Sequence, residues 1–440
     1  MTGVAPRNRV STDVAIIGAG PAGLTAAARL AAHHYRVVVL EREQSAGGIP
    51  RHSDHLGYGI RDLHRFISGP AYAARLTAAA ESAGAQIRTR SMVTAINTDD
   101  SLDVTTPDGL LQIEANAVIL ATGARERPRP ARLIPGDRPA GVYTTGHLQN
   151  VVHLHHGKVG SRAVVVGAEL VSWSAVMTLR HAGTDTALML TEYHSPESYG
   201  LFNLGGRVAF GVPVARRSRL TQIIGRPRVE AVEIEHLDTR ERSIIPCDTV
   251  VLTGDWIPDH ELARSAGIDI DPGTLGPLID TTLRTSRFGV FAAGNVLHPV
   301  DTADIAALDG RYVADEVHRY LTSRSAGWEP GQMRLRPGPA LRWLSPGRLR
   351  HGAVPPRNRL LAWTDHLVRI PTITVTQDGR VVARRKLAWP ASPGRVFRIP
   401  ADLLDAVDPQ GGEVIVDIAN APAGAPAADA SPSLRTLAQA

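Results

Sequence analysis

Three closely spaced glycines near the N-terminus are the residues with the clearest chemical purpose. The segment GAGPAG occupies residues 18–23, directly after a short apolar run and directly before an alanine-rich stretch. Gly18 permits a tight turn, Gly20 lets the backbone approach a pyrophosphate at the positive end of a helix, and Gly23 lets that helix pack on the preceding strand. The predicted pyrophosphate contacts are therefore Gly18, Gly20, Pro21, Ala22 and Gly23.

A strand, a helix and a second strand must hold this turn in place. The pattern predicts a strand over residues 12–17, a helix over 21–34 and a second strand that ends near residue 41. Glu41 ends that strand, where a carboxylate can accept hydrogen bonds from a ribose diol, and Arg42 follows it. A glycine triplet alone is weak evidence, but the complete unit predicts a dinucleotide site.

Two later segments favour FAD over NAD as the dinucleotide. Residues 118–123 form a buried strand that ends in a small-residue turn, and residues 289–295 form a second such strand that precedes a helix from about 302. Both strand ends can pass close to the dinucleotide. The further predicted cofactor contacts are Gly47, Gly48, Val93, Thr122, Gly123, Gly294, Asn295 and Thr302.

With these elements in place, residues 10–325 resemble the flavoproteins that have two dinucleotide-binding domains, such as the pyridine nucleotide-disulfide oxidoreductases. In that family an acidic residue at the position of Asn295 touches the ribityl and pyrophosphate groups. The following helix directs its positive end at the flavin. Asn295 retains the hydrogen-bonding capacity but not the charge.

A narrower resemblance lies in GGIPRH at 47–52 and in the ATGARERPRP segment. These are similar to the FAD subunits of opine oxidase, hydrogen cyanide synthase and dye-linked proline dehydrogenase, and to the alpha chain of heteromeric sarcosine oxidase. The resemblance implies oxidation of the carbon beside an amino or imino nitrogen, with hydride transfer to FAD. It also implies a small-molecule substrate and a second protein subunit or electron acceptor.

Four side chains are candidates for catalysis. Arg51 can hold a substrate carboxylate, and His52 can take a proton from a substrate amine. Tyr143 and His298 are candidates of the same kind. The alternative for Arg51 and His52 is that they contact only FAD phosphates or solvent.

A second strand, glycine turn and helix begins at residue 162 but departs from the motif. Its turn runs from Gly167 to Ser172. Glu169 stands where the backbone should approach a pyrophosphate, and Ser172 replaces the glycine that lets the helix pack on the strand. An acidic side chain there repels phosphates and blocks their approach. We therefore expect no productive NAD(P)H binding, although binding of a nucleotide in an altered way stays open.

Composition excludes several classes of protein and of redox site. The chain of 440 residues is 43% hydrophobic and 21% charged, and it contains no apolar run long enough to span a membrane. Cys247 is its only cysteine, which excludes an internal disulfide, a redox-active thiol pair and a four-thiolate iron–sulfur cluster. We expect a cytoplasmic protein. The histidines at 153, 155 and 156 lack a carboxylate at ligand spacing, so we expect no metal site.

The C-terminal part is strongly basic. Residues 331–400 hold thirteen arginines and one lysine against two aspartates, a balance of +12. Short strands around an Asp378-Gly379 turn predict a small β domain. We expect this domain to bind an acidic partner subunit. We do not expect it to bind nucleic acid, because the sequence contains no element that reads a nucleic-acid groove. The alternative is an ordinary solvated surface.

Together these patterns predict an α/β fold: a Rossmann-like FAD domain interrupted by a second Rossmann-like domain, with a small C-terminal β domain. The expected function is a FAD-dependent oxidoreductase subunit that oxidises an amino, imino or related small acid. Its alternatives are an NAD(P)H-dependent flavoprotein reductase and a noncatalytic FAD subunit of a larger complex. The expected boundaries are a flexible N-terminus at 1–11, the FAD domain at 12–155 and 277–327, the insert at 156–276, the basic β domain at 328–420 and a disordered tail at 421–440.

Overall fold

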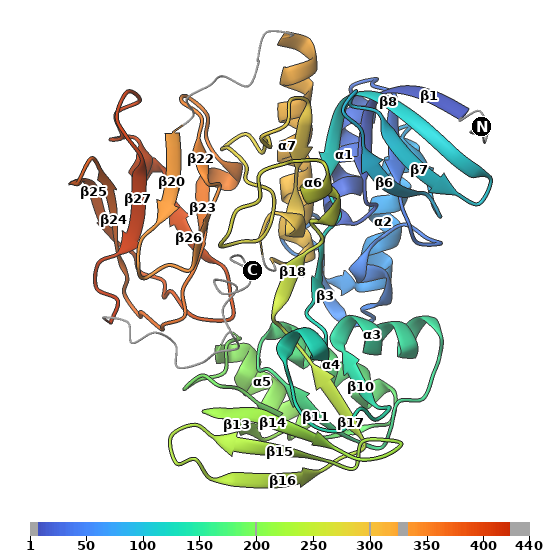
Figure 1. Cartoon of the computed structure of the whole chain (residues 1–440), viewed down its shortest axis with the longest axis vertical. Coiled ribbons are helices and arrows are strands. Elements are labelled where there is room, and N and C mark those ends of the chain that lie inside the picture. Colours follow the sequence, from blue (N-terminus) through green and yellow to red (C-terminus); the bar gives the residue numbers. More distant parts are fainter. Residues whose placement is uncertain (1–7, 199, 299–300, 324–332, 423–440) are drawn as a thin grey trace, which may run out of the picture.

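The computed structural model describes residues 8–198, 200–298, 301–323 and 333–422. They form three units (Figure 1). The first is an α/β unit with a mixed sheet, the second is an α/β unit with a parallel sheet, and the third is built of strands. The architecture agrees with the predicted fold class. The expected domain start at 328 and nearly all of the expected tail lie outside the described residues.

The first unit contains a seven-stranded sheet in the order β5-β2-β1-β8-β7-β6, with β19 beside β8. Helices α1 and α7 lie side by side against it (Figure 1). Strands β3 and β4 form a separate hairpin. The elements are β1 (Asn8–Ile17), α1 (Pro21–Ala32), β2 (Val37–Leu40), β3 (Leu56–Tyr58), β4 (Ile67–Ser68), α2 (Gly69–Ser82), β5 (Gln86–Arg88), β6 (Met92–Ile96), β7 (Leu102–Thr106), β8 (Gly109–Leu120), β19 (Val290–Ala292) and α7 (Ala303–Ser323).

The register of the parallel strands brings the predicted cofactor residues to one edge. Ile17 of β1 is level with Leu40 of β2 and with Leu120 of β8, and Leu120 is level with Ala292 of β19. The turns that follow these strands therefore meet at the carboxyl edge of the sheet, where open α/β sheets bind ligands.

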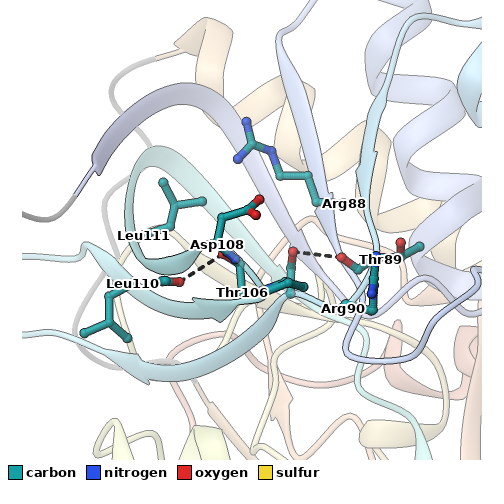
Figure 2. Close-up of a pocket in the computed structure, with 10 residues that line it drawn as sticks. Arg88, Thr89, Arg90, Thr106, Asp108, Leu110 and Leu111 are labelled. Atoms are coloured by element: carbon teal, nitrogen blue, oxygen red, sulfur yellow. Dashed lines mark hydrogen bonds between the residues drawn. The ribbon is translucent and has the colours of Figure 1, made fainter.

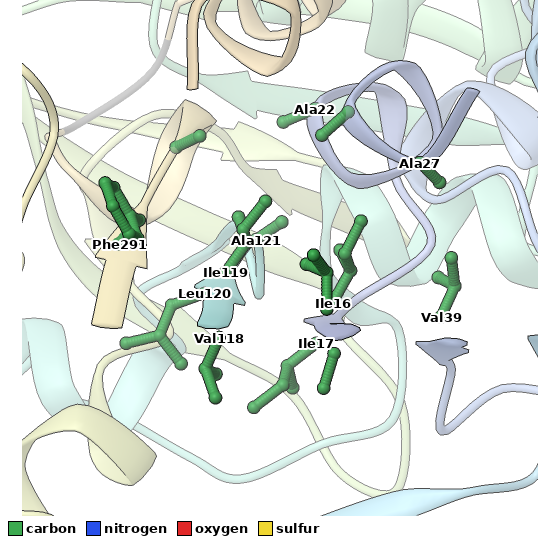
Figure 3. Close-up of a cluster of buried hydrophobic side chains, with 14 of the residues drawn as sticks. Ile16, Ile17, Ala22, Ala27, Val39, Val118, Ile119, Leu120, Ala121 and Phe291 are labelled. Carbon is green, nitrogen blue, oxygen red and sulfur yellow. The ribbon is translucent and has the colours of Figure 1, made fainter. Parts of the chain in front are cut away.

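A continuous apolar core fixes that register. The parallel strands read as runs of valine, isoleucine and leucine because both of their faces are buried. Ile16 and Val39 are fully buried, and so is Phe291 of β19 (Figure 3). Strand β1 begins at Asn8, so residues 8–11 are not the flexible N-terminus that the sequence predicts. They pair with residues 111–114 of β8 and extend the same sheet.

The second unit is inserted between β9 (Ala124–Glu126) and β18 (Trp256–Pro258), which pair antiparallel and carry the chain in and out. Its parallel sheet has the order β10-β17-β11-β12-β13 and lies beside a three-stranded antiparallel sheet, β14-β15-β16. Helix α6 (Glu261–Ser265) follows β18 in the chain. The elements are β10 (Val142–Thr144), α3 (Thr145–Gln149), β11 (Arg162–Val166), α4 (Leu170–His181), β12 (Asp185–Leu190), α5 (Gly200–Phe210), β13 (Val214–Ala215), β14 (Ser218–Ile224), β15 (Ala231–His236), β16 (Arg242–Pro246) and β17 (Thr249–Leu252).

The third unit has two sheets, β22-β20-β27-β24-β25 and β21-β23-β26, around a core of its own. The predicted hairpin is present, because β24 and β25 pair antiparallel around Asp378 and Gly379. The unit lies beside α7 (Figure 1). Its strands are β20 (Met333–Pro337), β21 (Trp343–Ser345), β22 (Arg348–Leu349), β23 (Arg359–Trp363), β24 (Thr372–Gln377), β25 (Arg380–Lys386), β26 (Phe397–Pro400) and β27 (Val414–Ile418).

Candidate functional site

The first glycine turn has the shape that a pyrophosphate requires. Gly18 has a φ of 104°, and a side chain there would collide with the carbonyl of Ala121. A side chain on Gly23 would likewise collide with the carbonyl of Gly18. Gly20, by contrast, has no heavy atom within 4 Å of the place of a Cβ. The turn is therefore closed toward the protein and open in front of the N-terminus of α1, where an anion is stabilised.

Glu41 lies against this turn. Its Oε2 accepts a hydrogen bond of 2.8 Å from the backbone N–H of Ala19, and its Oε1 accepts one of 2.8 Å from that of Glu43. The residue is 7% exposed. Each carboxylate oxygen has a second lone pair, so the group can still accept hydrogen bonds from a ribose diol.

Replacing Glu41 with alanine is expected to weaken FAD binding by about 1–3 kcal/mol, because charge-assisted hydrogen bonds to the ribose are lost. The measurement is calorimetric titration of the apoprotein with FAD. Glu114→Ala is the matched control, since Glu114 is an exposed acid of the same sheet. Equal FAD affinities in Glu41→Ala and the wild type would remove Glu41 from the site.

The loop after β2 returns to the glycine turn. A Cβ on Gly48 would lie 2.9 Å from the Cα of Gly20, so the two segments are in close contact. Gly47 packs against Ala73 of α2 in the same way. The loop continues into a short 3-10 helix, Ile49–His52. Arg51 and His52 lie in this helix, and the N–H of Arg51 donates a hydrogen bond of 3.1 Å to the carbonyl of Gly48.

His52 is 5% exposed, and this burial, followed by the charge of Arg51, lowers the pKa of its imidazole to about 4. The ring is therefore neutral at physiological pH and able to accept a hydrogen bond. Within the described residues, His52 Nδ1 and Arg51 Nε are buried atoms that lack a hydrogen-bond partner. Buried polar atoms in this state are uncommon, and a ligand is one way to satisfy them.

A buried polar network joins this loop to the second unit. Gln149 of α3 donates hydrogen bonds to Ser174 Oγ of α4 at 2.8 Å and to Ser53 Oγ at 3.2 Å. His55 Nε2 lies 2.7 Å from the same Ser174 oxygen. Sequence reasoning missed this network because its hydrogen-bonded partners lie up to 119 residues apart and match no motif.

The turns after β8 and β19 complete the cradle. Gly123 has a φ of 76° and faces open space, while Thr122 Oγ1 donates a hydrogen bond of 2.8 Å to the carbonyl of Asp259. Arg42 forms an ion pair of 3.0 Å with the same Asp259. A Cβ on Gly294 would lie 2.9 Å from the Cβ of Ala22, so the end of β19 touches the first turn of α1.

Asn295 is tied to the segment that leads into α7. Its Oδ1 accepts a hydrogen bond of 3.0 Å from the backbone N–H of Asp301, and its Nδ2 donates one of 3.1 Å to the Asp301 carbonyl. Thr302 lies next, immediately before the helix. Val93 is a core residue of β6 that is level with Val104 of β7.

The remaining two predicted catalytic residues pack against the second and third units. Tyr143, on β10, packs against the core of the second unit, with its ring 5.1 Å from that of His147. His298 is 1% exposed and stacks on Trp343 of the third unit at 5.3 Å. The catalytic roles of Tyr143 and His298 stay sequence-based predictions.

The second glycine turn contains a carboxylate of its own. Gly167 has a φ of 126°, the Glu169 N–H donates a hydrogen bond of 3.1 Å to Ser172 Oγ, and that oxygen lies 2.6 Å from Thr253 Oγ1. A side chain on Gly254 would collide with the Glu169 carboxyl group. The Glu169 carboxyl group therefore fills the space between this turn and Gly254, which follows β17.

Burial and three acidic neighbours, Glu197, Glu126 and Asp255, raise the pKa of Glu169. Desolvation raises the pKa of its carboxyl to about 8, with further contributions from Glu197 and Glu126. Glu197 is 6% exposed, and burial raises its pKa to about 7. At neutral pH these side chains thus carry protons for much of the time, so Glu169 obstructs the turn mainly by its volume.

An open hollow of about 390 Å³ lies on the first unit, between residues 88–91 and the β7–β8 hairpin (Figure 2). The wall formed by residues 88–91 is joined to the end of β2. The N–H of Ser91 donates to the Glu41 carbonyl, and that of Arg90 donates to the Glu43 carbonyl, both at 2.8 Å. The hollow therefore borders the segment that carries Glu41.

The family model described as pyridine nucleotide-disulphide oxidoreductase matches residues 12–310. The chain belongs to this family. It is an FAD-binding oxidoreductase, and the open cradle at Gly20, with Glu41 at its side, fits that cofactor. The sequence-based predictions of the family, the fold class and the cofactor are confirmed.

Two relatives illustrate the range of the pyridine nucleotide-disulphide oxidoreductases. An opine oxidase subunit of Agrobacterium tumefaciens is 28% identical over 343 residues, which cover 69% of this chain and 64% of that protein. The ferredoxin–NAD(+) reductase subunit of the benzene 1,2-dioxygenase system of Pseudomonas putida is 28% identical over 303 residues, 65% of this chain and 67% of that protein. The chain thus spans less than two thirds of the opine oxidase subunit.

The crystal structure of thioredoxin reductase from T. acidophilum has the same fold, with a TM-score of 0.60 and 23% identity over 71% of this chain and 99% of that one. The single cysteine of the present chain is Cys247, and burial raises the pKa of the Cys247 thiol to about 11. Across the described residues, no three His, Cys, Asp or Glu side chains gather as metal ligands. No helix in that part of the chain is long and apolar enough to cross a membrane.

Proposed function

We propose that the flavin of this protein takes its electrons from a small amino or imino acid and not from NAD(P)H. The observation that carries the proposal is the place of the Glu169 carboxyl group, which lies at the second glycine turn and against Gly254 in the segment after β17. A dinucleotide needs backbone N–H groups and free space at that place. The side chain removes the space, and any ionised fraction repels the phosphates.

The residues beside the first turn suit such a substrate. The guanidinium of Arg51 matches the planar geometry of a carboxylate. The neutral imidazole of His52 can accept the proton of the substrate amine as the adjacent carbon loses hydride, which leaves an imine. Bound FAD supplies the hydride acceptor. The relative named as an opine oxidase subunit is consistent with this substrate class.

A second candidate function is NAD(P)H-dependent reduction of an electron-carrier protein. The family description and the relative named ferredoxin–NAD(+) reductase subunit support this candidate more directly than they support amine oxidation. It requires Glu169 to move out of the second turn when the nucleotide binds. A noncatalytic role for FAD in a larger complex is the third candidate, and it predicts no reduction of the flavin by any of these donors.

The test is anaerobic titration of the FAD-loaded protein with sarcosine, proline, an opine, NADH and NADPH, monitored by the visible absorbance of the flavin. Bleaching by an amino or imino acid is the expected result. Arg51→Gln should then raise the KM for the carboxylate substrate by about tenfold or more, the loss of one charged hydrogen bond. Arg65→Gln, an exposed arginine of the same unit, is the control. Bleaching by NADH or NADPH alone would overturn the proposal.

A further inference from the structure

The arginines of the third unit are matched by acids of the same chain to a large extent. Four of them form ion pairs with aspartates of the first unit and of the segment that follows the insert. The expected basic surface is therefore smaller than the sequence suggests, because part of its charge is used between units. The four pairs are Arg348–Asp269, Arg350–Asp280, Arg357–Asp309 and Arg398–Asp301.

The pair between Arg398 of β26 and Asp301 lies at the start of α7. Arg398 Nη2 is 2.9 Å from Asp301 Oδ1 and 3.0 Å from Oδ2. The Asp301 side chain is 5% exposed and that of Arg398 is 29% exposed. A carboxylate that is buried to this degree needs a charged partner, since loss of the partner leaves an uncompensated charge.

Asp301 is also bonded to the end of β19. Its backbone N–H and carbonyl both hydrogen-bond to the Asn295 side chain, and its Oδ1 accepts a hydrogen bond of 2.9 Å from the N–H of Thr302. Asn295 follows Gly294, which touches Ala22 in the first turn of α1. Contacts thus run from the third unit through Asp301 and Asn295 to the cofactor cradle.

We propose that Arg398 is a positioning residue for the flavin: it neutralises Asp301 and, through Asp301, holds Asn295 and the N-terminus of α7 in place. The third unit is then part of the flavin site, although it belongs to neither dinucleotide-binding unit. The proposal rests on FAD binding and not on the identity of the electron donor.

The electrostatic consequence has a definite sign. Without Arg398, the charge of Asp301 remains buried next to the end of the cradle. A negative charge there disfavours both the binding of the FAD phosphates and the addition of electrons to the flavin. Removal of Arg398 should therefore weaken FAD binding and shift the flavin midpoint potential to more negative values.

The Arg357–Asp309 pair provides a matched control. It also joins the third unit to α7, and its side chains are buried to a similar degree, 21% exposed for Arg357 and 5% for Asp309. Asp309, however, lies eight residues further along the chain than Asp301 and is not bonded to Asn295 among the described contacts. A purely structural link between units would make the two pairs equivalent.

The experiment compares Arg398→Gln with Arg357→Gln by FAD titration of the apoprotein and by spectroelectrochemistry of the loaded protein. Arg398→Gln should weaken FAD binding by about tenfold, or about 1.4 kcal/mol, and lower the midpoint potential. Arg357→Gln should change thermal stability without changing the potential. Equal effects of the two variants on affinity and potential would overturn the proposal.

Two further variants keep the test decisive if Arg398→Gln folds poorly. Arg398→Lys should restore most of the potential, because one nitrogen of Arg398 makes both contacts to Asp301. Adding Asp301→Asn to Arg398→Gln should also restore it, because the uncompensated charge is gone. If neither variant differs from Arg398→Gln, the role of Arg398 is not electrostatic positioning and the proposal fails.

Discussion

Gly20→Val is expected to yield protein without FAD. The backbone at Gly20 has an ordinary φ of −81°, and no protein atom lies within 4 Å of the place of its Cβ. The Cβ of a valine therefore meets no distant segment of the apoprotein, and its side chain occupies the path of the pyrophosphate. We expect FAD affinity to fall at least about 100-fold, or about 2.7 kcal/mol.

Gly205→Val is the matched control for this variant. Gly205 lies on α5 in the second unit, is exposed, and likewise has nothing within 4 Å of a Cβ. The measurement is the ratio of FAD to protein after purification, followed by titration of both apoproteins with FAD. Retention of FAD at one equivalent in Gly20→Val would contradict the assignment of this turn.

Glu169→Gly is expected to create a functional nucleotide site in the second unit. The change removes the carboxyl group that lies against Gly254 and restores a glycine at the N-cap of α4, where glycine is well tolerated. We expect NADH to bind at least about tenfold more tightly, which corresponds to about 1.4 kcal/mol. Reduction of the flavin by NADH should accelerate accordingly.

The control for Glu169→Gly is Glu241→Gly, which removes an exposed acid from the same unit. Both variants remove one acidic side chain, so any difference between them reports on the glycine turn itself. Calorimetry measures NADH binding directly, and rapid mixing measures flavin reduction. If Glu169→Gly and Glu241→Gly bind NADH equally, Glu169 is not the obstacle that we infer.

The parts of the structure that follow local rules were predictable from the sequence. Glycine spacing and apolar runs specify the first turn, and the parallel register then places Glu41 and Asn295 at the same edge of the sheet. The start of β1 at Asn8 was missed because residues 8–11 have no apolar pattern. They join the strand by pairing with β8, a contact between segments distant in sequence.

Contacts between units could not be predicted in the same way. Arg398 and Asp301 are 97 residues apart, and Gln149 and Ser53 are 96 residues apart. Neither pair belongs to a motif, because each depends on how two folded units pack together. His298 shows the same limit: its stacking on Trp343 of the third unit depends on how the units pack.

The most direct test of the account is anaerobic rapid mixing of the wild-type, FAD-loaded protein with NADH and, separately, with NADPH. The account predicts flavin reduction slower than about 1 per second, the low end of ordinary enzyme turnover, because Glu169 occupies the second glycine turn. Faster reduction by either nucleotide would contradict it and would identify the protein as an NAD(P)H-dependent reductase.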